Sequence, residues 1–383
     1  MASIHPMVLR WGIISTGSIA AQFSTDLLID PKTRNVHDIT HKITAVGSRT
    51  LPKAQEFIDT VLGGDKSIKA YGDYEEIWKD DEVDVIYIGT PHTHHYSPSY
   101  SALNFGKKHV LCEKPVTSNL AELQYLIKPA KLNGLFFMEA MWTRFLPLSL
   151  EVKKISDGLD GDWDLGLPLS VHADLSGDFN IHNIPKTHRI LDPVLGGGAL
   201  LDLGPYPLVW TIMALYEHPA FVNTNNDGIS VKGSMLKTLP SLGGVDCNTS
   251  FVLNFQSKPS SSTPSRFAAQ ATLSCSINTE SLDPGVTIRY ERGMIKVAAP
   301  IYVPKSFSVV QYDGEKKIVK EEKREFEYVG RGMHYQADEV ARCIRDGKTE
   351  SSLWGHEKSL FEMWVFDEVC REYEFPPGVE KVT

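Results

Sequence analysis

The chain has 383 residues, of which 42% are hydrophobic and 23% are charged, a mixture typical of a globular protein rather than a disordered one. Because one hydrophobic core seldom serves a chain of this length, we expect two domains. The formal net charge of -9 argues against a general nucleic-acid binder or a protein of anionic membrane surfaces. The expected partners are therefore small molecules.

The cysteines and the N-terminus indicate a cytosolic protein without a metal site. No C-x-x-C pair occurs, and no histidine lies near a cysteine at metal-ligand spacing. The N-terminus lacks a basic segment followed by an apolar run, and nowhere do about 18 apolar residues follow one another. We therefore expect reduced thiols at all five positions, which are Cys112, Cys247, Cys275, Cys343 and Cys370.

Residues 1–145 alternate short apolar runs with amphipathic stretches, a pattern typical of a parallel sheet covered by helices. We predict a Rossmann-type α/β domain here, with residues 30–41 as a surface loop. The predicted strands are 7–14, 42–48, 81–90, 108–114 and 135–141, and the predicted helices are 18–28, 51–61, 74–79, 96–107 and 120–134.

Residues 146–383 are predicted to form a second, α+β domain. In "AQATLSCSI" the apolar side chains alternate with Thr272, Ser274 and Ser276, which indicates a sheet with one buried face. We therefore expect an open, predominantly antiparallel sheet that pairs two copies of the chain as a homodimer. The predicted strands are 168–176, 247–255, 269–277, 286–299 and 306–312, joined in part by a connection at 257–265, and the predicted helices are 333–347 and about 355–375, the last packing back on the first domain.

The turn "STGSIA" after the first strand has the context of a dinucleotide-binding fingerprint. Gly17 stands where a bare backbone lets a pyrophosphate approach, whereas Ser15 replaces the first glycine of the usual motif. The following helix N-terminus offers N–H donors and a partial positive charge. A tight strand-to-helix turn without a ligand is the alternative. The candidate contacts are Ser15, Thr16, Gly17, Ser18 and Ile19.

The end of the second strand favours NADP over NAD. NAD binding commonly uses an acidic residue here for the ribose hydroxyls, whereas an arginine accommodates the additional phosphate of NADP. This chain has Arg49 between Ser48 and Thr50, and a guanidinium flanked by two hydroxyls suits a phosphate dianion. A solvent-exposed arginine without a ligand is the alternative interpretation.

Four segments together resemble the Gfo/Idh/MocA oxidoreductases over nearly the whole chain. They are "WGIISTGSIA", "IGTPHTHHYSPSYSALNFGKKHVLCEKP", "EAMWTRFLP" and "RILDPVLGGGALLDLGPYPL". Within the family the set is most similar to dimeric dihydrodiol dehydrogenases and fungal NADP-dependent D-xylose 1-dehydrogenases.

This resemblance implies that Lys114, Asp202 and Tyr206 are catalytic. Oxidising an alcohol by hydride transfer needs a base for the hydroxyl proton, and a free tyrosine with a pKa of about 10 is a poor base at neutral pH. We expect Tyr206 to be the base, Lys114 to favour its ionised form and Asp202 to orient the lysine or the substrate. Taken alone, Asp202 is more commonly a helix cap and Tyr206 a core aromatic.

The resemblance also implies further contacts at the junction of the domains. For the cofactor these are Thr90, Pro91, His95, Glu113, Lys114, Pro115, with a special and often cis turn, and Arg144, and for the substrate Glu139, Trp142, Arg189 and Tyr206. Core packing of Trp142 with a Glu139–Arg144 salt bridge is an equally weighted alternative. His92 and His94 are expected to be exposed, and no carboxylate or cysteine accompanies them as a metal ligand would.

These expectations lead to an NADP-dependent sugar dehydrogenase. The resemblance favours oxidation of D-xylose at the anomeric carbon to D-xylonolactone, with oxidation of trans-dihydrodiols to catechols as the alternative enzyme activity. A protein that binds NADP as a regulator without turnover is an alternative of another class, because a fold does not fix a function. The presence of all three catalytic residues argues against such a regulator.

Overall fold

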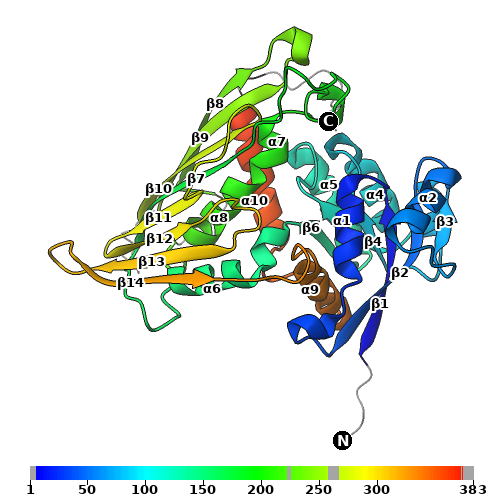
Figure 1. The fold of residues 1–383 in the computed structure, drawn as a ribbon, viewed down its shortest axis with the longest axis horizontal. Helices are drawn as coiled ribbons and strands as arrows, with labels where there is room; N and C mark the ends of the chain where they lie inside the picture. The colour runs from blue at the N-terminus through cyan, green and yellow to red at the C-terminus, as the bar shows by residue number, and fades with distance from the viewer. Residues whose placement is uncertain (1–5, 222–225, 258–266, 372, 374–383) are drawn as a thin grey trace, which may run out of the picture. The chain divides into compact units, whose positions relative to one another are not determined.

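The computed structural model describes residues 6–221, 226–257, 267–371 and 373 (Figure 1). The described chain forms two compact units. Among the described residues, the first unit contains the chain up to Trp142 together with Tyr328–Met363, and the second contains the described part of Thr143–Glu327 with residues 364–371 and 373. The segment Tyr328–Met363, which we expected in the second domain, thus groups with the first.

The first unit is built on a six-stranded, all-parallel sheet with the order β3-β2-β1-β4-β5-β6. The strand order reverses between β1 and β4, so ligands of such sheets bind beyond the carboxyl ends of these strands. This topology confirms the predicted Rossmann-type fold. The strands are β1 (Met7–Ile14), β2 (Ile39–Gly47), β3 (Lys69–Tyr71), β4 (Val85–Ile88), β5 (His109–Glu113) and β6 (Phe137–Ala140).

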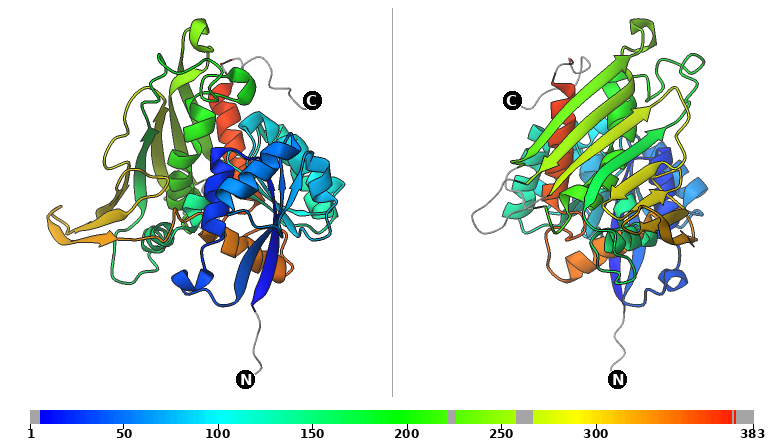
Figure 2. Two further views of the ribbon diagram at one scale, coloured as in Figure 1. Left: turned by 45° about the vertical axis from the view of Figure 1, so that its right-hand side comes forward. Right: turned by 90° about the vertical axis from the view of Figure 1, so that its left-hand side faces the viewer.

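Helices cover both faces of this sheet (Figures 1 and 2). The apolar runs of β4 and β5 and residues 11–14 of β1 are buried throughout, as expected for parallel strands enclosed on two sides. The elements are α1 (Ser18–Leu27), α2 (Leu51–Val61), α3 (Tyr74–Trp78), α4 (Tyr96–Asn104), α5 (Leu120–Leu132), α9 (His334–Arg345), the first part of α10 (His356–Cys370), and the 3-10 turns η1 (Pro31–Arg34), η2 (His92–His94) and η3 (Trp142–Phe145).

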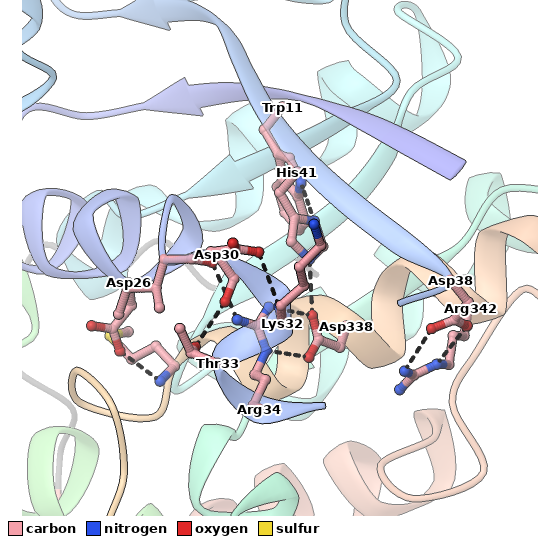
Figure 3. Close-up of polar contacts among 12 residues, drawn as sticks. Trp11, Asp26, Asp30, Lys32, Thr33, Arg34, Asp38, His41, Asp338 and Arg342 are labelled. Carbon is pink, nitrogen blue, oxygen red and sulfur yellow. Dashed lines mark hydrogen bonds and ion pairs between the residues drawn. The ribbon is translucent and has the colours of Figure 1, made fainter. Parts of the chain in front are cut away.

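A buried ion pair ties α9 to the segment between α1 and β2 (Figure 3). Arg34 donates two hydrogen bonds to Asp338, each 2.7 Å long, and both side chains are only 3% exposed. A second ion pair joins the same elements: Asp38, just before β2, lies 3.1 Å from Arg342 on α9. The prediction of a surface loop at 30–41 is therefore wrong for Arg34, whose side chain is buried in this ion pair, and for residues 39–41, which belong to β2.

The second unit contains an eight-stranded sheet, seen face on in the right-hand view of Figure 2. Only β7 and β10 pair in parallel, so the prediction of a predominantly antiparallel sheet is confirmed. The predicted strand 286–299 is two strands joined by a turn at Glu291–Arg292. In the order β14-β13-β12-β11-β7-β10-β9-β8, the strands are β7 (Pro168–Ser176), β8 (Ile229–Lys237), β9 (Asp246–Gln256), β10 (Ala268–Ser276), β11 (Val286–Tyr290), β12 (Gly293–Val297), β13 (Ser306–Tyr312) and β14 (Ile318–Glu325).

Helices pack on one face of this sheet, where α7 and α8 contact β7, β9 and β10. The stretch Pro193–Tyr216 is long and apolar enough to cross a membrane, but 94% of its most apolar window is buried, as in the core helix of a globular unit. Residues 258–265 of the predicted strand connection lie outside the described residues. The helical elements are α6 (Pro147–Ser156), η4 (Pro193–Leu195), α7 (Ala199–Leu203), α8 (Pro205–Thr211), the π-turn η5 (Ile212–Tyr216), η6 (Pro240–Leu242) and the later part of α10.

Candidate active site

The turn between β1 and α1 has a left-handed backbone at Ser15, with φ of 99°. Glycine normally occupies such a position, because a side chain there costs roughly 1–2 kcal/mol. Two hydrogen bonds offset this strain. The Ser15 N–H donates to the Gly47 carbonyl at 3.0 Å, and the Ser15 hydroxyl accepts from the Gly17 N–H at 3.2 Å. Serine thus replaces the fingerprint glycine while keeping its backbone conformation.

Gly17 precedes α1, whose first-turn N–H groups at Ser18 and Ile19 are donors suited to an anion. A Cβ atom at Gly17 would touch only the Ser15 hydroxyl, at the ordinary distance of 3.4 Å, and the φ of -79° suits any residue. The protein itself therefore does not require glycine here. A bound phosphate pressed against the backbone would require it.

Gly17→Ala is accordingly expected to weaken NADP binding by about tenfold or more, equal to about 1.4 kcal/mol, while the unfolding temperature stays unchanged. Isothermal titration calorimetry and thermal unfolding measure the two quantities. Gly314→Ala, at another open position with no atom within 4 Å of the added Cβ, is the control and should alter neither. Equal NADP affinity in Gly17→Ala and the wild type would exclude the turn as a phosphate site.

The end of β2 presents an exposed, unpaired guanidinium. Ser48 is 4% exposed and its hydroxyl lies 3.3 Å from that of Thr16, whereas Arg49 and Thr50 are exposed. Within the described part of the chain no carboxylate pairs with Arg49. Burial raises the pKa of Tyr74, and the nearby Arg49 charge opposes this rise. Tyr74, which the sequence reasoning missed, thus lies close to Arg49.

His95 links the loops that follow β4 and β5. It is fully buried, with Nε2 2.8 Å from the Thr90 carbonyl and Nδ1 2.8 Å from the Pro115 carbonyl. Burial lowers the pKa of His95 to about 3, so the ring is neutral and its single N–H donates to one of these carbonyls. His94 is exposed as predicted, but His92 is only half-exposed.

Lys114 follows β5 and is 9% exposed, and the peptide bond between it and Pro115 is cis. Its backbone N–H donates to the Glu113 carboxylate at 3.2 Å, and the Tyr87 hydroxyl donates to the same carboxylate at 2.7 Å. Burial raises the pKa of Glu113 to about 7, although Lys114 lowers it. The lysine is thus held beside a carboxyl group that titrates near neutral pH.

Glu139 at β6 does not form the alternative salt bridge with Arg144. Its carboxylate instead accepts hydrogen bonds from the backbone of Val116 and from the side chains of Trp354 and Ser359. Glu139 is 2% exposed, which fits a residue that supports other elements from the interior. Trp142 is 6% exposed. Arg144 pairs with Glu217 at 3.4 Å, while its Nε and Nη1 atoms are buried without a hydrogen-bond partner among the described residues.

In the second unit, the motif "GGGALLDLGPY" forms one continuous helical path through α7 and α8. Gly204 between them has helical angles, φ -56° and ψ -30°. Its N–H donates to the Leu200 carbonyl and its carbonyl accepts from Leu208. Asp202 and Tyr206, four residues apart, therefore share one helical face. Both are nearly buried, at 5% and 7% exposure, and the Tyr206 ring lies 5.6 Å from that of Tyr302.

Arg189 pairs with Asp202 through two contacts of 3.1 Å that join both guanidinium Nη atoms to both carboxylate oxygens. Such a two-pronged contact fixes the orientation of a carboxylate. The charge of Asp202 raises the pKa of Arg189, and Tyr206 contributes to the same rise. The sequence assigned Arg189 to the substrate, and the structure brings it together with Asp202 and Tyr206.

The sequence reasoning missed Asp246, which holds the start of α7. Its carboxylate accepts hydrogen bonds from the Leu200 N–H at 2.8 Å and the Thr249 hydroxyl at 2.7 Å. Burial raises its pKa to about 6. A Cβ at Gly198, where φ is 116°, would lie 2.0 Å from Asp246 Oδ1. The last glycine of the triplet is thus the residue that lets a carboxylate from β9 reach the helix.

No group of three or more histidine, cysteine, aspartate or glutamate side chains is arranged to hold a metal ion among the residues that the structure describes. The four cysteines Cys112, Cys247, Cys275 and Cys343 are buried thiols, and Cys370 is half-buried.

A doubly wound parallel sheet with a glycine-containing turn at its first helix, joined to a second unit with an open sheet, defines an oxidoreductase of the dinucleotide-binding class. Residues 9–141 match the sequence model of the family GFO_IDH_MocA, described as an oxidoreductase family with an NAD-binding Rossmann fold. The chain is 35% identical to a D-xylose 1-dehydrogenase (NADP(+)) of Hypocrea jecorina, over 97% of this chain and 94% of that protein. It is 34% identical to a trans-1,2-dihydrobenzene-1,2-diol dehydrogenase of Danio rerio, over 96% and 97% of the two chains.

Solved structures share the fold of the whole chain. An aldose-aldose oxidoreductase from Caulobacter crescentus superposes with a TM-score of 0.73 at 20% identity, over 95% of this chain and 96% of that one. A 3-ketoreductase from Actinomadura kijaniata in complex with NADP gives a TM-score of 0.69 at 20% identity, over 95% and 97%. The protein belongs to the Gfo/Idh/MocA oxidoreductase family, which confirms the resemblance seen in its sequence.

Proposed function

We propose that the protein catalyses the NADP-dependent oxidation of an aldopyranose at its anomeric carbon, with D-xylose as substrate and D-xylonolactone as product. The observation that carries this proposal is the 35% identity to a D-xylose 1-dehydrogenase (NADP(+)) along 97% of the chain. The residues proposed for catalysis are all present, and those of the second unit share one helical face.

The residues at the carboxyl ends of β1 and β2 fit NADP. The turn at Ser15–Gly17 offers backbone donors and open space above Gly17 for a pyrophosphate. At the end of β2, Ser48, Arg49 and Thr50 stand where an NAD-binding protein commonly has an acidic residue. The exposed Arg49 side chain would bind the 2′-phosphate, and Tyr74 lies close to it.

Arg49→Ala is therefore expected to raise the Kd for NADP by about 10–100-fold, since a hydrogen bond to a charged group contributes about 1.5–3 kcal/mol. The Kd for NAD should change by less than about twofold, because NAD lacks the additional phosphate. Titration calorimetry with both cofactors measures the difference. Lys53→Ala, an exposed cation on α2, controls for the general loss of positive charge. Equal weakening of NADP and NAD would contradict a 2′-phosphate site at Arg49.

The proposed chemistry assigns one role to each catalytic side chain. NADP, when bound, supplies the hydride acceptor. Tyr206 takes the proton of the anomeric hydroxyl, and the ammonium group of Lys114 favours the phenolate form that this step needs. Asp202, whose carboxylate is fixed by Arg189, orients the sugar. Glu113, whose pKa burial raises to about 7 although Lys114 lowers it, lies beside Lys114 and is the carboxyl group next to the lysine that titrates near neutral pH.

The test is NADPH formation, followed by absorbance, with D-xylose, D-glucose, inositol and a trans-dihydrodiol. Preference for D-xylose supports the proposal. Preference for the dihydrodiol supports the second candidate, which rests on the 34% identity to a trans-1,2-dihydrobenzene-1,2-diol dehydrogenase. Tight NADP binding with no turnover on any substrate would instead support an NADP-binding regulator.

A cytoplasmic homodimer formed through the open sheet is part of the same proposal. One face of the eight-stranded sheet is packed by α7 and α8, and its other face carries polar side chains, including the hydrogen-bonded Asn254 and Gln270. Light scattering on the purified protein decides between a monomer and a dimer.

A further inference from the structure

Two buried carboxyl groups in the first unit lie behind the segment that follows Lys114. Glu139 comes from β6 and is 2% exposed, and Glu362 comes from the first part of α10 and is fully buried. Burying one carboxylate is costly, and burying two in contact is prohibitive unless a proton is shared. Their hydrogen bonds show which of the two carries that proton.

Glu139 has the hydrogen-bond partners of an ionised carboxylate. Its Oε1 accepts from the Val116 N–H at 3.0 Å, and its Oε2 accepts from the Trp354 indole at 3.1 Å and the Ser359 hydroxyl at 2.6 Å. Three donors aimed at one carboxyl group favour its charged form.

Glu362 has the opposite surroundings. Neither of its oxygens has a hydrogen-bond donor among the described residues. It lies three positions after Ser359 on α10, and the Ser359 hydroxyl donates to Glu139 at 2.6 Å, which places the two carboxyl groups near each other. A hydrogen bond between two carboxyl groups requires a proton on one of them. Burial, and then the charge of Glu139, raise the pKa of Glu362 well above its usual value, while Lys114 lowers it. Glu362 is therefore the protonated member of the pair.

We propose that protonated Glu362 is a positioning residue for Lys114: it donates a hydrogen bond to Glu139, which in turn holds the Val116 backbone and so the turn that carries the lysine. This inference rests on the proposed function of Lys114. The hydrogen bond from Glu362 is the fourth donated to Glu139. It links α10 to the turn after β5, so that Glu362 acts on Val116, 246 positions earlier in the sequence.

The proton on Glu362 also limits the negative charge around Lys114. Three carboxyl groups interact with one another or with this lysine, namely Glu113, Glu139 and Glu362. If Glu362 lost its proton, the ammonium group would be drawn toward it and away from the proposed base. A neutral side chain at position 362 is thus required, and it must also donate to Glu139.

Two variants separate these requirements from simple packing. Glu362→Gln keeps the size and offers an amide N–H to Glu139, so kcat should remain within about twofold of the wild type. Glu362→Ala removes the donor, so kcat should fall at least tenfold while the Kd for NADP stays within about twofold. Glu357→Gln, on the exposed side of the same helix, is the matched control. A Gln variant as impaired as the Ala variant would overturn the proposal.

A second measurement needs no substrate. Above about pH 4.3, the usual pKa of glutamate, the unfolded chain releases a proton that the folded protein retains on Glu362. The stability of the wild type must therefore fall with rising pH relative to Glu362→Gln, which has no such proton. Thermal unfolding from pH 5 to pH 8 should show the Gln variant gaining in unfolding temperature over the wild type. A constant difference across this range would overturn the proposal.

The two measurements also distinguish this inference from the proposed function. If the wild type turns over no substrate, the proposed function fails, and the pH dependence of unfolding decides whether the proton is shared. If the wild type is active and the pH dependence is flat, the function stands and the role of Glu362 fails.

Discussion

Tyr206→Phe is expected to lower kcat for D-xylose oxidation by about 10²–10⁴-fold, the contribution of a positioned general base. The aromatic ring is buried at 7% exposure beside Tyr302, and phenylalanine fills the same space, so the folded structure should persist. Lys114→Met should give a loss of similar size, because the phenolate would lack its stabilising charge. NADPH formation followed by absorbance, with thermal unfolding as a check on folding, measures both variants.

Tyr312→Phe on β13 is the control for this experiment, since it removes the same hydroxyl group from a strand of the second unit and should leave kcat unchanged. A Tyr206→Phe variant that retains activity within tenfold of the wild type would show that another group takes the proton. NADP affinity should be equal in the wild type, Tyr206→Phe and Tyr312→Phe, since neither change touches the turn at Gly17 or the end of β2.

Asp338→Asn is expected to lower the free energy of unfolding of the first unit by about 3–5 kcal/mol, the effect of leaving a buried charge unpaired. Arg34 would lose its carboxylate partner while remaining 3% exposed. His41 adds to the effect. Its Nδ1 accepts from the Trp11 indole at 3.2 Å, so its Nε2 carries the proton that it donates to Asp338 at 3.0 Å (Figure 3). Urea denaturation followed by circular dichroism and tryptophan fluorescence measures the loss.

The pH dependence of this effect has a defined sign. Burial alone would raise the pKa of Asp338, but the hydrogen bonds from Arg34 and His41 lower it overall. The ion pair therefore stabilises the fold at pH values above the usual aspartate pKa of about 3.9, and this contribution is lost as the pH falls through the lower pKa of the folded state. Between pH 5 and pH 8 the difference between wild type and variant should be constant.

Asp346→Asn provides the matched comparison, because Asp346 pairs with Arg345 on the surface with side chains 43% and 38% exposed. An exposed pair of this kind contributes about 0–1 kcal/mol. If Asp338→Asn lowers the free energy of unfolding by the same small amount, Arg34 must bind water or another acceptor instead. The ion pair with α9 would then not be what holds the 30–41 segment.

Several helices and strands could be predicted because turn residues and hydrophobic periodicity within each segment mark them. The helix at Leu51–Val61 has proline at its second position and an amphipathic pattern, and its bounds were predicted without error. The β7 and β13 bounds were also predicted correctly from alternation of period two. The hairpin of β11 and β12 was predicted as one strand, because apolar residues stand on both sides of its turn at Glu291–Arg292.

The candidate site residues were predicted from motifs. The residues that hydrogen-bond to them, or that cap their helices, belong to no motif and could not be predicted in that way. Asp246 lies 46 residues from the Leu200 N–H that it accepts from, and the sequence around it carries no sign of a helix cap. The sequence assigned Glu139 to the substrate, with a salt bridge to Arg144 as the alternative. Its hydrogen-bond donors instead come from the turn after β5 and from residues 354 and 359.

The sequence by itself determined the class of fold, the tight turn at Ser15 and Gly17, and the family, since each depends on neighbouring residues or on a motif. The elements β3, β8, β14 and α6 were not predicted. The tertiary structure alone decided which charges are buried and what pairs with them. Arg34 with Asp338, Asp202 with Arg189, and Glu139 with Trp354 and Ser359 are such cases. Burial and hydrogen-bond partners set the charge of a carboxyl group, and for these groups both are supplied by segments 13 to 304 positions away.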